Sequence, residues 1–555
     1  MVTNGESERE LGRDRVRRRP FLRGVGSLAV GVAGVAGVAG CITPDDGPSV
    51  DDEATRLIAD GFEEAGVDPP LEVDLVTNEQ SYRSRWAEFL MDELEATGFF
   101  DVSFEPYEWT TYQRVASRAA DEERVALICF GWTGGWDPHD YVNRVFHSAH
   151  HTPDGTNLNH YESEDADALI EAGIETSDRD ERVDIYRDLQ EHLAAEVPVS
   201  FVRFGEAYHV WSDDVEGWRA YPTSSGTYYP VYAPFAGVCT ELAADRDELV
   251  VAIPSDVVSA DPVTVQDATS LQAIALVYES LLNVDFDGDV VPQLATDWER
   301  LDSGAYRFHL RDDARFHNGE RLTAEHVVGS FERYEGTIRE SVVYDWYDDA
   351  EIVDEHTIDV HLRRAFAPFE TAVAQVPIVP LAAIDGDHDL RTEPLGTGPY
   401  RFDEHQPGSR WRIARFEDHW YEGGAVPATP PIETVTFEVI VESSVRDGAI
   451  KAGDVDVSTG VLMDSVSEFE DDPSFGVDRR ITGEYECLVY PLYATPFDNE
   501  KVRRGCNALI PRERIVDSIY HGIGEPAYTP ISPLLEAYAD AEFRERIADE
   551  YVRLE

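Results

Sequence analysis

The sequence predicts a mixed α/β protein of several lobes, on three observations. At 555 residues, the chain is too long for one compact core. Residues 71–133 alternate strand and helix patterns, which is typical of a largely parallel sheet with helices on its faces. Residues 296–416 contain three β-hairpin patterns interspersed with helices, and no internal repeat is found.

The front part of the chain predicts strand, helix, strand, helix, strand. Residues 71–78 alternate as a strand, and the helix pattern after them places Trp86, Leu90 and Leu94 on one face. A second strand over 101–109 and a short helix precede "RVALICFGW", a continuous apolar strand. We expect Cys129, inside that apolar run, to be buried.

The later hairpins have clear turn signals. The first two are predicted to turn at residues 302–304 and 354–356, and the third covers residues 401–416. Another stretch, "LVVAIPSDVVSADPVTVQDA" at 249–268, has the pattern of the start of a mature protein: a buried strand, a polar Asp-Pro turn, then a helix beginning at Ser270. Its place in the middle of the chain needs an explanation.

The charge of the chain is strongly acidic. There are 110 acidic against 46 basic residues, a net charge of −64, and Lys451 and Lys501 are the only lysines. The acid is spread along the whole chain, which favours a generally acidic, hydrated surface suited to concentrated salt. Nucleic-acid binding is disfavoured because phosphate contacts need a basic face.

The first 41 residues predict an export signal. Arg17, Arg18 and Arg19 precede Phe21-Leu22 in a twin-arginine pattern, and a weakly apolar stretch ends in small residues before Cys41. This pattern indicates a lipoprotein processing site, with Cys41 carrying the lipid and residues 42–53 forming a tether. The alternative is an uncleaved anchor helix, for which the apolar stretch is short. Both place the rest of the chain outside the cytoplasm.

The other cysteines form no C-x-x-C pair, so a zinc ribbon or redox motif is not indicated. They are Cys129, Cys239, Cys487 and Cys506. Their spacing leaves open whether any two are bridged.

Enzyme motifs are absent from the sequence: there is no G-x-S-x-G, H-E-x-x-H, P-loop or strand-borne G-x-G-x-x-G. No cofactor and no catalytic residue is predicted. The one metal-like cluster is the histidine-rich run 139–160, where Pro, Gly and Asn favour a solvated loop over a metal site. Were the loop to bind a metal, the candidate ligands are His147, His150 and His151.

Five ordered motifs after residue 249 carry a resemblance. They are "LVYESLLNVDFDGDVVPQLATDWE" (276–299), "YRFHLRDDARFHNGERLTAEHVVGSFER" (306–333), "PLGTGPYRF" (394–402), "GAIKAGDVDV" (448–457) and the segment 496–533. Together these resemble the extracellular solute-binding proteins of the peptide/nickel class, family 5, which feed ABC importers. The resemblance implies a type II periplasmic-binding-protein fold with two large lobes around a hinge and a smaller subdomain.

The front half resembles the far end of the same family. Residues 54–67, 130–148 and 180–198 resemble segments that usually follow the region 496–533. The simplest interpretation is a circular permutation, in which the usual start at Leu249 is joined to the usual end near Ala236. A gene-model artefact joining two damaged copies is the alternative. Natural termini lie at the surface and often close together, which makes a permutation physically reasonable.

This interpretation divides the chain into named segments. The first lobe is 249–290 with 394–485, the small subdomain is 291–393, and the second lobe is 486–555 with 54–216. Residues 217–236 return to the first lobe, and 237–248 join the usual ends.

The ligand contacts are predicted in "GWTGGWDP", which leaves the apolar strand and enters the cleft. The candidates are Trp132, Thr133, Gly134, Gly135, Trp136 and Asp137, with Tyr278 and Tyr490 as weaker ones from matching family positions. In peptide-binding members a carboxylate shortly after the Gly-Trp pairs with the ligand's amino group. That position is Gly135 or Trp136 in this chain, and the nearest acid is Asp137, a departure that argues against a plain dipeptide. Trp132 is expected either in the core or at the ligand, and Trp136 is expected to be exposed.

The implied function is that of the extracytoplasmic, lipid-anchored binding component of an ABC importer. It would be a monomer that captures a peptide-like or other small solute between its lobes and delivers it to the permease. Two alternatives stay open: a ligand sensor for a membrane signalling receptor, and a secreted hydrolase.

Overall fold

The computed structural model describes residues 52–79, 81–120, 124–222, 231–243, 246–302 and 304–553. The twin-arginine pattern, Cys41 and the tether predicted for residues 42–53 therefore lie almost entirely outside the described residues. Within those ranges, no helix combines the length and the apolar character that crossing a membrane requires.

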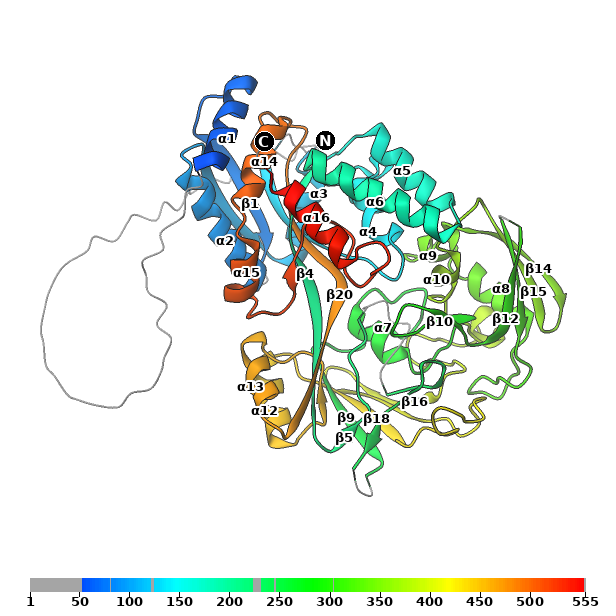
Figure 1. Ribbon diagram of the computed structural model, residues 1–555. Helices are drawn as coiled ribbons and strands as arrows, with labels where there is room; N and C mark the ends of the chain where they lie inside the picture. The colour runs from blue at the N-terminus through cyan, green and yellow to red at the C-terminus, as the bar shows by residue number, and fades with distance from the viewer. Residues whose placement is uncertain are drawn as a thin grey trace, which may run out of the picture. The chain divides into compact units, whose positions relative to one another are not determined.

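A single mixed sheet of 11 strands forms the backbone of the fold (Figure 1). In spatial order its strands are β16 (Tyr400–Gln406), β17 (Arg410–Arg415), β18 (Thr434–Val439), β9 (Glu248–Ile253), β19 (Val457–Ser458), β4 (Val199–Ser212), β20 (Phe475–Val489), β3 (Ala126–Thr133), β1 (Leu71–Asn78) and β2 (Phe100–Tyr107), with β21 (Glu525–Pro526) on β4. Strand β4 of the front half lies between β19 and β20 of the back half, so the two halves form one sheet.

Strands β4 and β20 run through the middle of the molecule as a long antiparallel pair. Their register extends from Phe475 opposite Ser212 to Val489 opposite Val199, with a break between Ile481 and Tyr485. One end of the pair joins β19 of the first lobe, and the other joins β3 of the second lobe. The two lobes are therefore connected through a continuous ladder with an irregularity at its centre.

The second lobe confirms the predicted order of strands and helices at the front of the chain. Strand β1 pairs in parallel with both β2 and β3, while β3 pairs antiparallel with β20. Cys129 in β3 is buried, as expected. The helices of this lobe are α1 (Asp52–Ala65), α2 (Ser81–Ala96), α3 (Trp109–Arg118), α4 (His139–Phe146), α5 (Glu164–Glu175), α6 (Arg179–Glu196), α14 (Glu500–Ala508), α15 (Arg512–Ile519) and α16 (Ala541–Tyr551).

In the first lobe, β9 lies between β18 and β19 and pairs in parallel with both. The helix after it is α7 (Ala268–Ile274), which begins two residues earlier than the start predicted at Ser270. Its N-cap is Asp267. The third predicted hairpin is confirmed as the antiparallel pair β16–β17. The helices α12 (Ser443–Ala452) and α13 (Val466–Asp471) complete this lobe.

The small subdomain is a separate four-stranded antiparallel sheet. Its order is β12 (Ala295–Asp302), β13 (Ala305–Leu310), β15 (Thr357–Leu362) and β14 (Tyr347–Asp354), which confirms both predicted hairpins. Around it lie α8 (Ala324–Glu332), α9 (Ser341–Tyr344), α10 (Phe369–Val373) and α11 (Leu381–Ile384). The rings of Trp346 and Phe369 pack edge to face in its core, with centroids 5.1 Å apart.

The segment that joins the two halves is held by short strand pairs. Strand β5 (Val215–Glu216) pairs with β8 (Glu241–Leu242), and β6 (Tyr232–Ala233) pairs with β7 (Val238–Cys239). A further short pair, β10 (Leu282–Val284) with β11 (Val290–Pro292), precedes the small subdomain. Cys129, Cys239, Cys487 and Cys506 are all free thiols.

A buried charge cluster supports the second-lobe end of the β4–β20 pair. Glu486 on β20 is 1% exposed and accepts hydrogen bonds from Arg83 (3.2 Å), the Trp86 indole (3.0 Å) and the Tyr520 hydroxyl (2.6 Å). The Arg203 guanidinium, on β4, lies 3.5 Å from Glu486 and over the Tyr520 ring. Burial acts to raise the pKa of Glu486, but these two guanidiniums and the hydrogen bonds outweigh it and hold the pKa below its usual value.

We predict that Glu486→Ala destabilises the protein by about 3–5 kcal/mol, because it leaves two buried guanidiniums without their shared counter-ion. The measurement is urea unfolding at constant salt. A matched control is Glu468→Ala, which removes the exposed partner of Lys451 and should cost at most about 1 kcal/mol. Equal losses for the two variants would contradict a structural role for the cluster.

Candidate functional site

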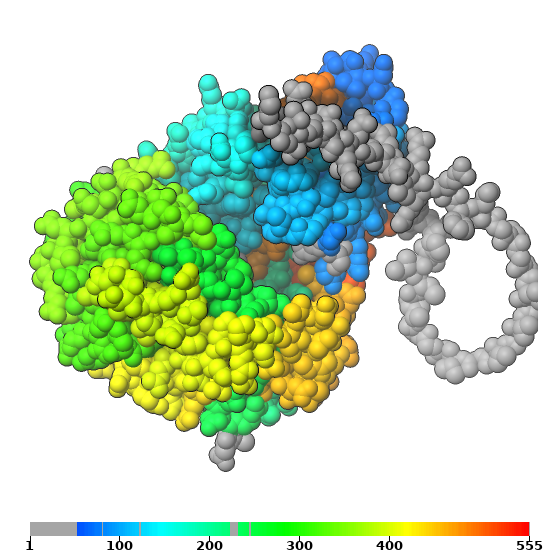
Figure 2. All heavy atoms as spheres, turned by 180° about the vertical axis from the view of Figure 1, so that it is seen from behind, coloured from blue at the N-terminus to red at the C-terminus, as the bar shows by residue number. Residues whose placement is uncertain are grey.

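A cavity of about 710 Å³ lies between the second lobe and the small subdomain. The second lobe lines it with the end of β3, the loop after it, α4 and α5, including Trp132 and Asp140. The small subdomain lines it with residues around α9 and α10, including Trp346, Arg364 and Phe366. Figure 2 shows the cyan surface of the second lobe adjoining the green surface of the small subdomain. Four predicted residues, Trp132, Thr133, Gly134 and Gly135, line this cavity.

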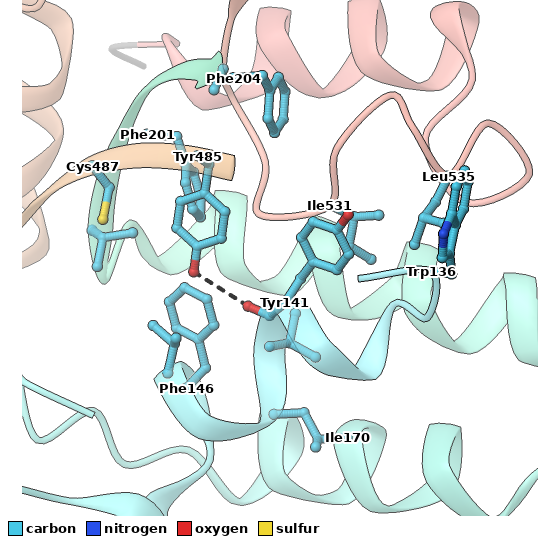
Figure 3. Packing of buried hydrophobic residues seen from close by; sticks show 14 of the residues in the cluster. Trp136, Tyr141, Phe146, Ile170, Phe201, Phe204, Tyr485, Cys487, Ile531 and Leu535 are labelled. Carbon is cyan, nitrogen blue, oxygen red and sulfur yellow. Dashed lines mark hydrogen bonds between the residues drawn. The ribbon is translucent and has the colours of Figure 1, made fainter. Parts of the chain in front are cut away.

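The loop that carries these residues is fixed against the long strand pair. The Gly134 N–H donates to the carbonyl of Gly483 in β20 (3.0 Å), and the Tyr141 hydroxyl donates to the carbonyl of Gly135 (2.9 Å). A Cβ on Gly134 would lie 2.5 Å from the Tyr141 ring, so a glycine is required by this close approach. The Tyr485 hydroxyl in turn donates to the carbonyl of Tyr141, and Figure 3 shows the rings of both tyrosines in the packed core.

Asp137, the nearest acid to the predicted position, is occupied by a protein partner. Its two carboxylate oxygens accept from Arg182 at 2.7 Å each, and one also accepts from the His139 N–H at 2.9 Å. Both side chains are buried. Asp137 therefore lies in a bidentate ion pair, at the wall of a second cavity of about 1220 Å³.

Asp140 is a carboxylate at the wall of the 710 Å³ cavity that was not predicted from the sequence. A Cβ on Gly135 would lie 2.8 Å from Oδ2 of Asp140, so the carboxylate occupies the space a side chain at Gly135 would take. Burial, and then the charge of Asp137, raise the pKa of Asp140 to about 7, although Arg182, Arg144 and the Gly135 N–H oppose them. Asp140 is five residues after Gly135 in the sequence, and the turn into α4 places its carboxylate beside Gly135. The sequence alone does not predict this proximity.

The two tryptophans of the loop point to different cavities. Trp132 is half-buried, and its indole N–H donates to the carbonyl of Asp140 at 2.7 Å. Trp136 was expected to be exposed, and that expectation is wrong: it is 9% exposed and donates to the Tyr221 hydroxyl at 2.9 Å. Its ring fits against Gly288, where a Cβ would lie 2.9 Å from it, and in Figure 3 it lies beside Leu535.

The two weaker ligand-binding candidates, Tyr278 and Tyr490, do not line the cavity beside the loop that contains Trp132. Tyr278 is 4% exposed, donates to the carbonyl of Ala260 at 3.0 Å, and borders only a cavity of about 30 Å³. Tyr490 is fully buried, and its hydroxyl lies 2.5 Å from that of Ser200. Neither lines the 710 Å³ cavity.

The histidine-rich run is partly helical. Residues 139–146 form α4, whereas the sequence predicted a loop, because Tyr141, Val142, Val145 and Phe146 all find buried positions along one short helix. His139, His147 and His150 line the cavity, while His151 stacks on His160 with ring centroids 4.7 Å apart. Within the described residues, no group of three or more His, Cys, Asp or Glu is arranged to hold a metal ion. Burial lowers the pKa of His139 to about 4.

The second lobe and the small subdomain touch at the rim of the cavity. Arg144 on α4 lies 3.3 Å from Asp345, which follows α9, and the Ala367 N–H donates to the carbonyl of Ile174 at 2.7 Å. These two parts are therefore in direct contact at the rim. The Arg144–Asp345 pair is half-exposed, so its contribution is small and sensitive to salt.

Residues 289–550 match the family model described as "Bacterial extracellular solute-binding proteins, family 5 Middle". The chain is 23% identical over 307 residues to the glutathione-binding protein GsiB of Pectobacterium atrosepticum, covering 53% of this chain and 59% of that protein. It is 26% identical over 307 residues to the nickel-binding periplasmic protein of Escherichia coli, covering 52% and 57%. The chain thus spans little more than half the length of these curated relatives.

Among solved structures, the chain is similar to the periplasmic binding protein DppA from Helicobacter pylori in complex with the peptide STSA. The identity is 25%, the match covers 41% of this chain and 49% of that chain, and the TM-score is 0.37.

We predict that Arg144→Gln shifts the protein toward a more open arrangement, because it removes one of the contacts across the rim. The expected change is of order 0.2–1 kcal/mol, or up to about fivefold in the open–closed ratio. The measurement is the radius of gyration by small-angle scattering at low salt. Asp345→Asn should have the same effect and add nothing to Arg144→Gln, whereas Arg56→Gln, which removes an exposed pair within α1, should change nothing. Additive effects of the two rim variants would contradict a direct pair.

Proposed function

We propose that the chain is a member of the bacterial extracellular solute-binding proteins of family 5, whose model residues 289–550 match, and that it captures a small solute between its lobes for an ABC importer. Family members are binding proteins. The proposed solute is peptide-like or another small molecule, and the proposed partner is the membrane permease, which recognises the closed form of a monomer.

One observation carries this proposal: the walls of the 710 Å³ cavity come from two different parts of the chain, the second lobe and the small subdomain. A solute in this cavity contacts both walls only when they are closed. Binding therefore stabilises the closed arrangement by the free energy of the contacts that the open arrangement lacks. The register break between Ile481 and Tyr485 is a suitable place for the ladder to bend.

The cavity is of a size and chemistry suited to a small organic molecule. Its volume lies within the range of small-molecule sites, and its walls combine aromatic rings with a few polar groups. Trp132 and Trp346 supply the rings, while Asp140 and Arg364 supply charge. No step in this function makes or breaks a covalent bond.

The proposal includes a circular permutation of the family's order, and the positions of the first and last described helices support it. Both ends contact α14. The carbonyl of Ala54 in α1 lies close to Gly505, and Asn507 donates to the carbonyl of Tyr551 at the end of α16 (2.8 Å). Lys501 and Glu64 add an ion pair between α14 and α1 at 2.5 Å. The chain could therefore be closed there by a short connection.

The interleaving of strands supports the permutation over a fusion of two damaged copies. Strand β4 of the front half inserts between β19 and β20 of the back half, so neither half forms the central sheet alone. Two unrelated fragments have no reason to complement each other strand for strand. The lobe boundaries predicted from sequence remain a prediction.

We further propose that the protein is exported by the twin-arginine route, is anchored through a lipid on Cys41 outside the cell membrane, and works in concentrated salt. The first two rest on the sequence pattern alone, since those residues lie outside the described ranges. For the third, both lysines form ion pairs, Lys451 with Glu468 and Lys501 with Glu64, while most of the acid remains at the surface.

We predict that one class of small solute stabilises the full chain in molar salt. A solute at a hundred times its dissociation constant should add about 2.7 kcal/mol, a readily measured rise in melting temperature. The screen covers di- to pentapeptides, amino acids, oligosaccharides and divalent metal chelates. Absence of any response across all of these classes would count against the solute-binding function, and turnover of a bound member would indicate an enzyme instead.

We also predict that a reordered chain, residues 249–553 followed by a short linker and 54–236, folds to the same structure. Its melting temperature should lie within about 5 °C of the original, because only surface connections change and loop closure depends weakly on length. Circular dichroism and thermal melting provide the measurement. If the original chain folds cooperatively and the reordered chain does not, the proposed permutation is wrong.

A further inference from the structure

We propose that Trp136 is a positioning residue for solute binding. Its indole holds the loop that lines the 710 Å³ cavity against the β10–β11 pair, so that this loop is in place before a solute arrives. The inference rests on the proposed function and adds to it a residue that acts on the solute without touching it.

Trp136 reaches from the second lobe to segments that are distant in the sequence. Its indole N–H donates to the Tyr221 hydroxyl at 2.9 Å, and that hydroxyl donates to the carbonyl of Val284 in β10 at 3.0 Å. The hydroxyl thus both accepts and donates, which satisfies the polar groups of both side chains. The ring of Trp136 also fits against Gly288 in the β10–β11 turn, where a Cβ would lie 2.9 Å from it. We call these contacts of Trp136 with Tyr221 and Gly288 the indole contact.

The β10–β11 turn that receives the indole is fixed by its own hydrogen bonds. The Asp285 carboxylate accepts from the N–H groups of Asp287 and Asp289 at 2.9 and 3.0 Å, and the Asp285 N–H donates to the carbonyl of Asp289 at 3.0 Å. Gly288 has a φ of +84°, in the left-handed region that glycine adopts readily. The turn therefore owes its shape to its own residues and offers Trp136 a preformed surface.

On the side of the second lobe, the residues next to Trp136 are held as well. Asp137 forms its buried pair with Arg182 of α6, and the Gly134 N–H donates to the carbonyl of Gly483 in β20. The loop is therefore held by α6, by β20 and, through Trp136, by β10–β11. The last of these connects the loop to the strand pair that precedes the small subdomain, which forms the other wall of the cavity.

The indole contact is separate from the cavity in which the solute is proposed to bind. Thr133, Gly134 and Gly135 line the 710 Å³ cavity, whereas Trp136 and Gly288 line the neighbouring cavity of about 1220 Å³. Formation of the contact therefore needs no solute. A replacement at Gly288 leaves every side chain of the 710 Å³ cavity in the protein, so an effect on binding must come from the position of the loop.

The indole contact is also neutral and buried, which suits concentrated salt. Trp136 is 9% exposed and Tyr221 is 7% exposed, and salt screens charges rather than a neutral contact of this kind. The Arg144–Asp345 pair at the rim is ionic and half-exposed, and molar salt weakens it. Of these two contacts, the indole contact is the one that keeps its strength as the salt concentration rises.

A purely structural role for Trp136, as one more side chain of the core, is the competing interpretation. Both roles predict a lower melting temperature when the contact is lost. They differ in the arrangement of the solute-free protein. Under the positioning role, loss of the contact lets the second lobe move away from β10–β11 while the core stays folded, and a bound solute reverses this movement.

The experiment uses the full chain in molar KCl. Gly288→Ala places a Cβ against the indole, Tyr221→Phe removes the hydroxyl between Trp136 and Val284, and Trp136→Ala removes the indole. Gly386→Ala is the matched control, because Gly386 also has a positive φ of +79° but a Cβ there would meet nothing within 4 Å. The measurements are the radius of gyration by small-angle scattering, the melting temperature, and calorimetric binding of tri-alanine, maltose and the nickel–histidine chelate.

We expect Gly288→Ala and Tyr221→Phe to stay folded with a larger radius of gyration than the wild type, and Gly386→Ala to match the wild type. In the Trp136→Ala background, Gly288→Ala should add nothing, because its effect passes through the indole. Should Trp136→Ala fail to fold, Trp136→Phe takes its place, since the smaller ring leaves room for the Cβ.

The affinity for a solute should follow the same order. A probe that binds the wild type should bind Gly288→Ala and Tyr221→Phe about five- to tenfold more weakly, because part of its binding free energy is used to bring the loop back. At saturation, the probe should restore the radius of gyration of the wild type.

The inference is overturned if Gly288→Ala and Gly386→Ala have the same radius of gyration, or if Gly288→Ala has the same effect with and without the indole of Trp136. A lower melting temperature with an unchanged radius and an unchanged affinity would assign Trp136 to the core alone. Scattering from the solute-free proteins decides whether the indole contact holds the loop, with no probe needed. Failure of all three probes to bind the wild type would count instead against the proposed function.

Discussion

The antiparallel pair β4–β20 is the constraint on which the rest of the structure depends. A ladder of this length must satisfy its hydrogen bonds with partners from both lobes, so β19 joins it at one end and β3 at the other. Two register shifts, between Ile481 and Tyr485 and between Glu486 and Cys487, make the ladder irregular between these ends. Among the strands of the described residues, β4 and β20 are the pair that reaches both β19 and β3.

The ligand loop is coupled to this pair by short contacts. Gly134 bonds to Gly483 at the register break, and Tyr485, two residues further along β20, bonds to Tyr141 in α4. On the same strand, Glu486 is locked by two arginines and Tyr520. The irregular part of β20 therefore holds the loop through Gly483 and contains Glu486, the centre of the charge cluster.

The treatment of charge differs between the interior and the cavity. In the core, the buried acids Glu486 and Asp137 have arginine partners, and the guanidiniums beside Glu486 help hold its pKa below the usual value. Asp140 lines the cavity, where burial and the charge of Asp137 raise its pKa to about 7.

Periodicity and turn signals in the sequence predicted the strands and helices of the second lobe and the hairpins of the small subdomain, because these depend on neighbours close along the chain. The family was indicated by a resemblance of five ordered motifs. Only the tertiary structure decided which residues of "GWTGGWDP" line a cavity and which are bound by other parts of the protein. Asp137 was the acid that sequence indicated, but its partner Arg182 is 45 positions away, and Trp136 is buried by Tyr221, 85 positions away. Asp140 reaches the place of Gly135 only through the turn into α4. Which polar group is left unpaired depends on contacts between distant segments, and local sequence carries no signal for them.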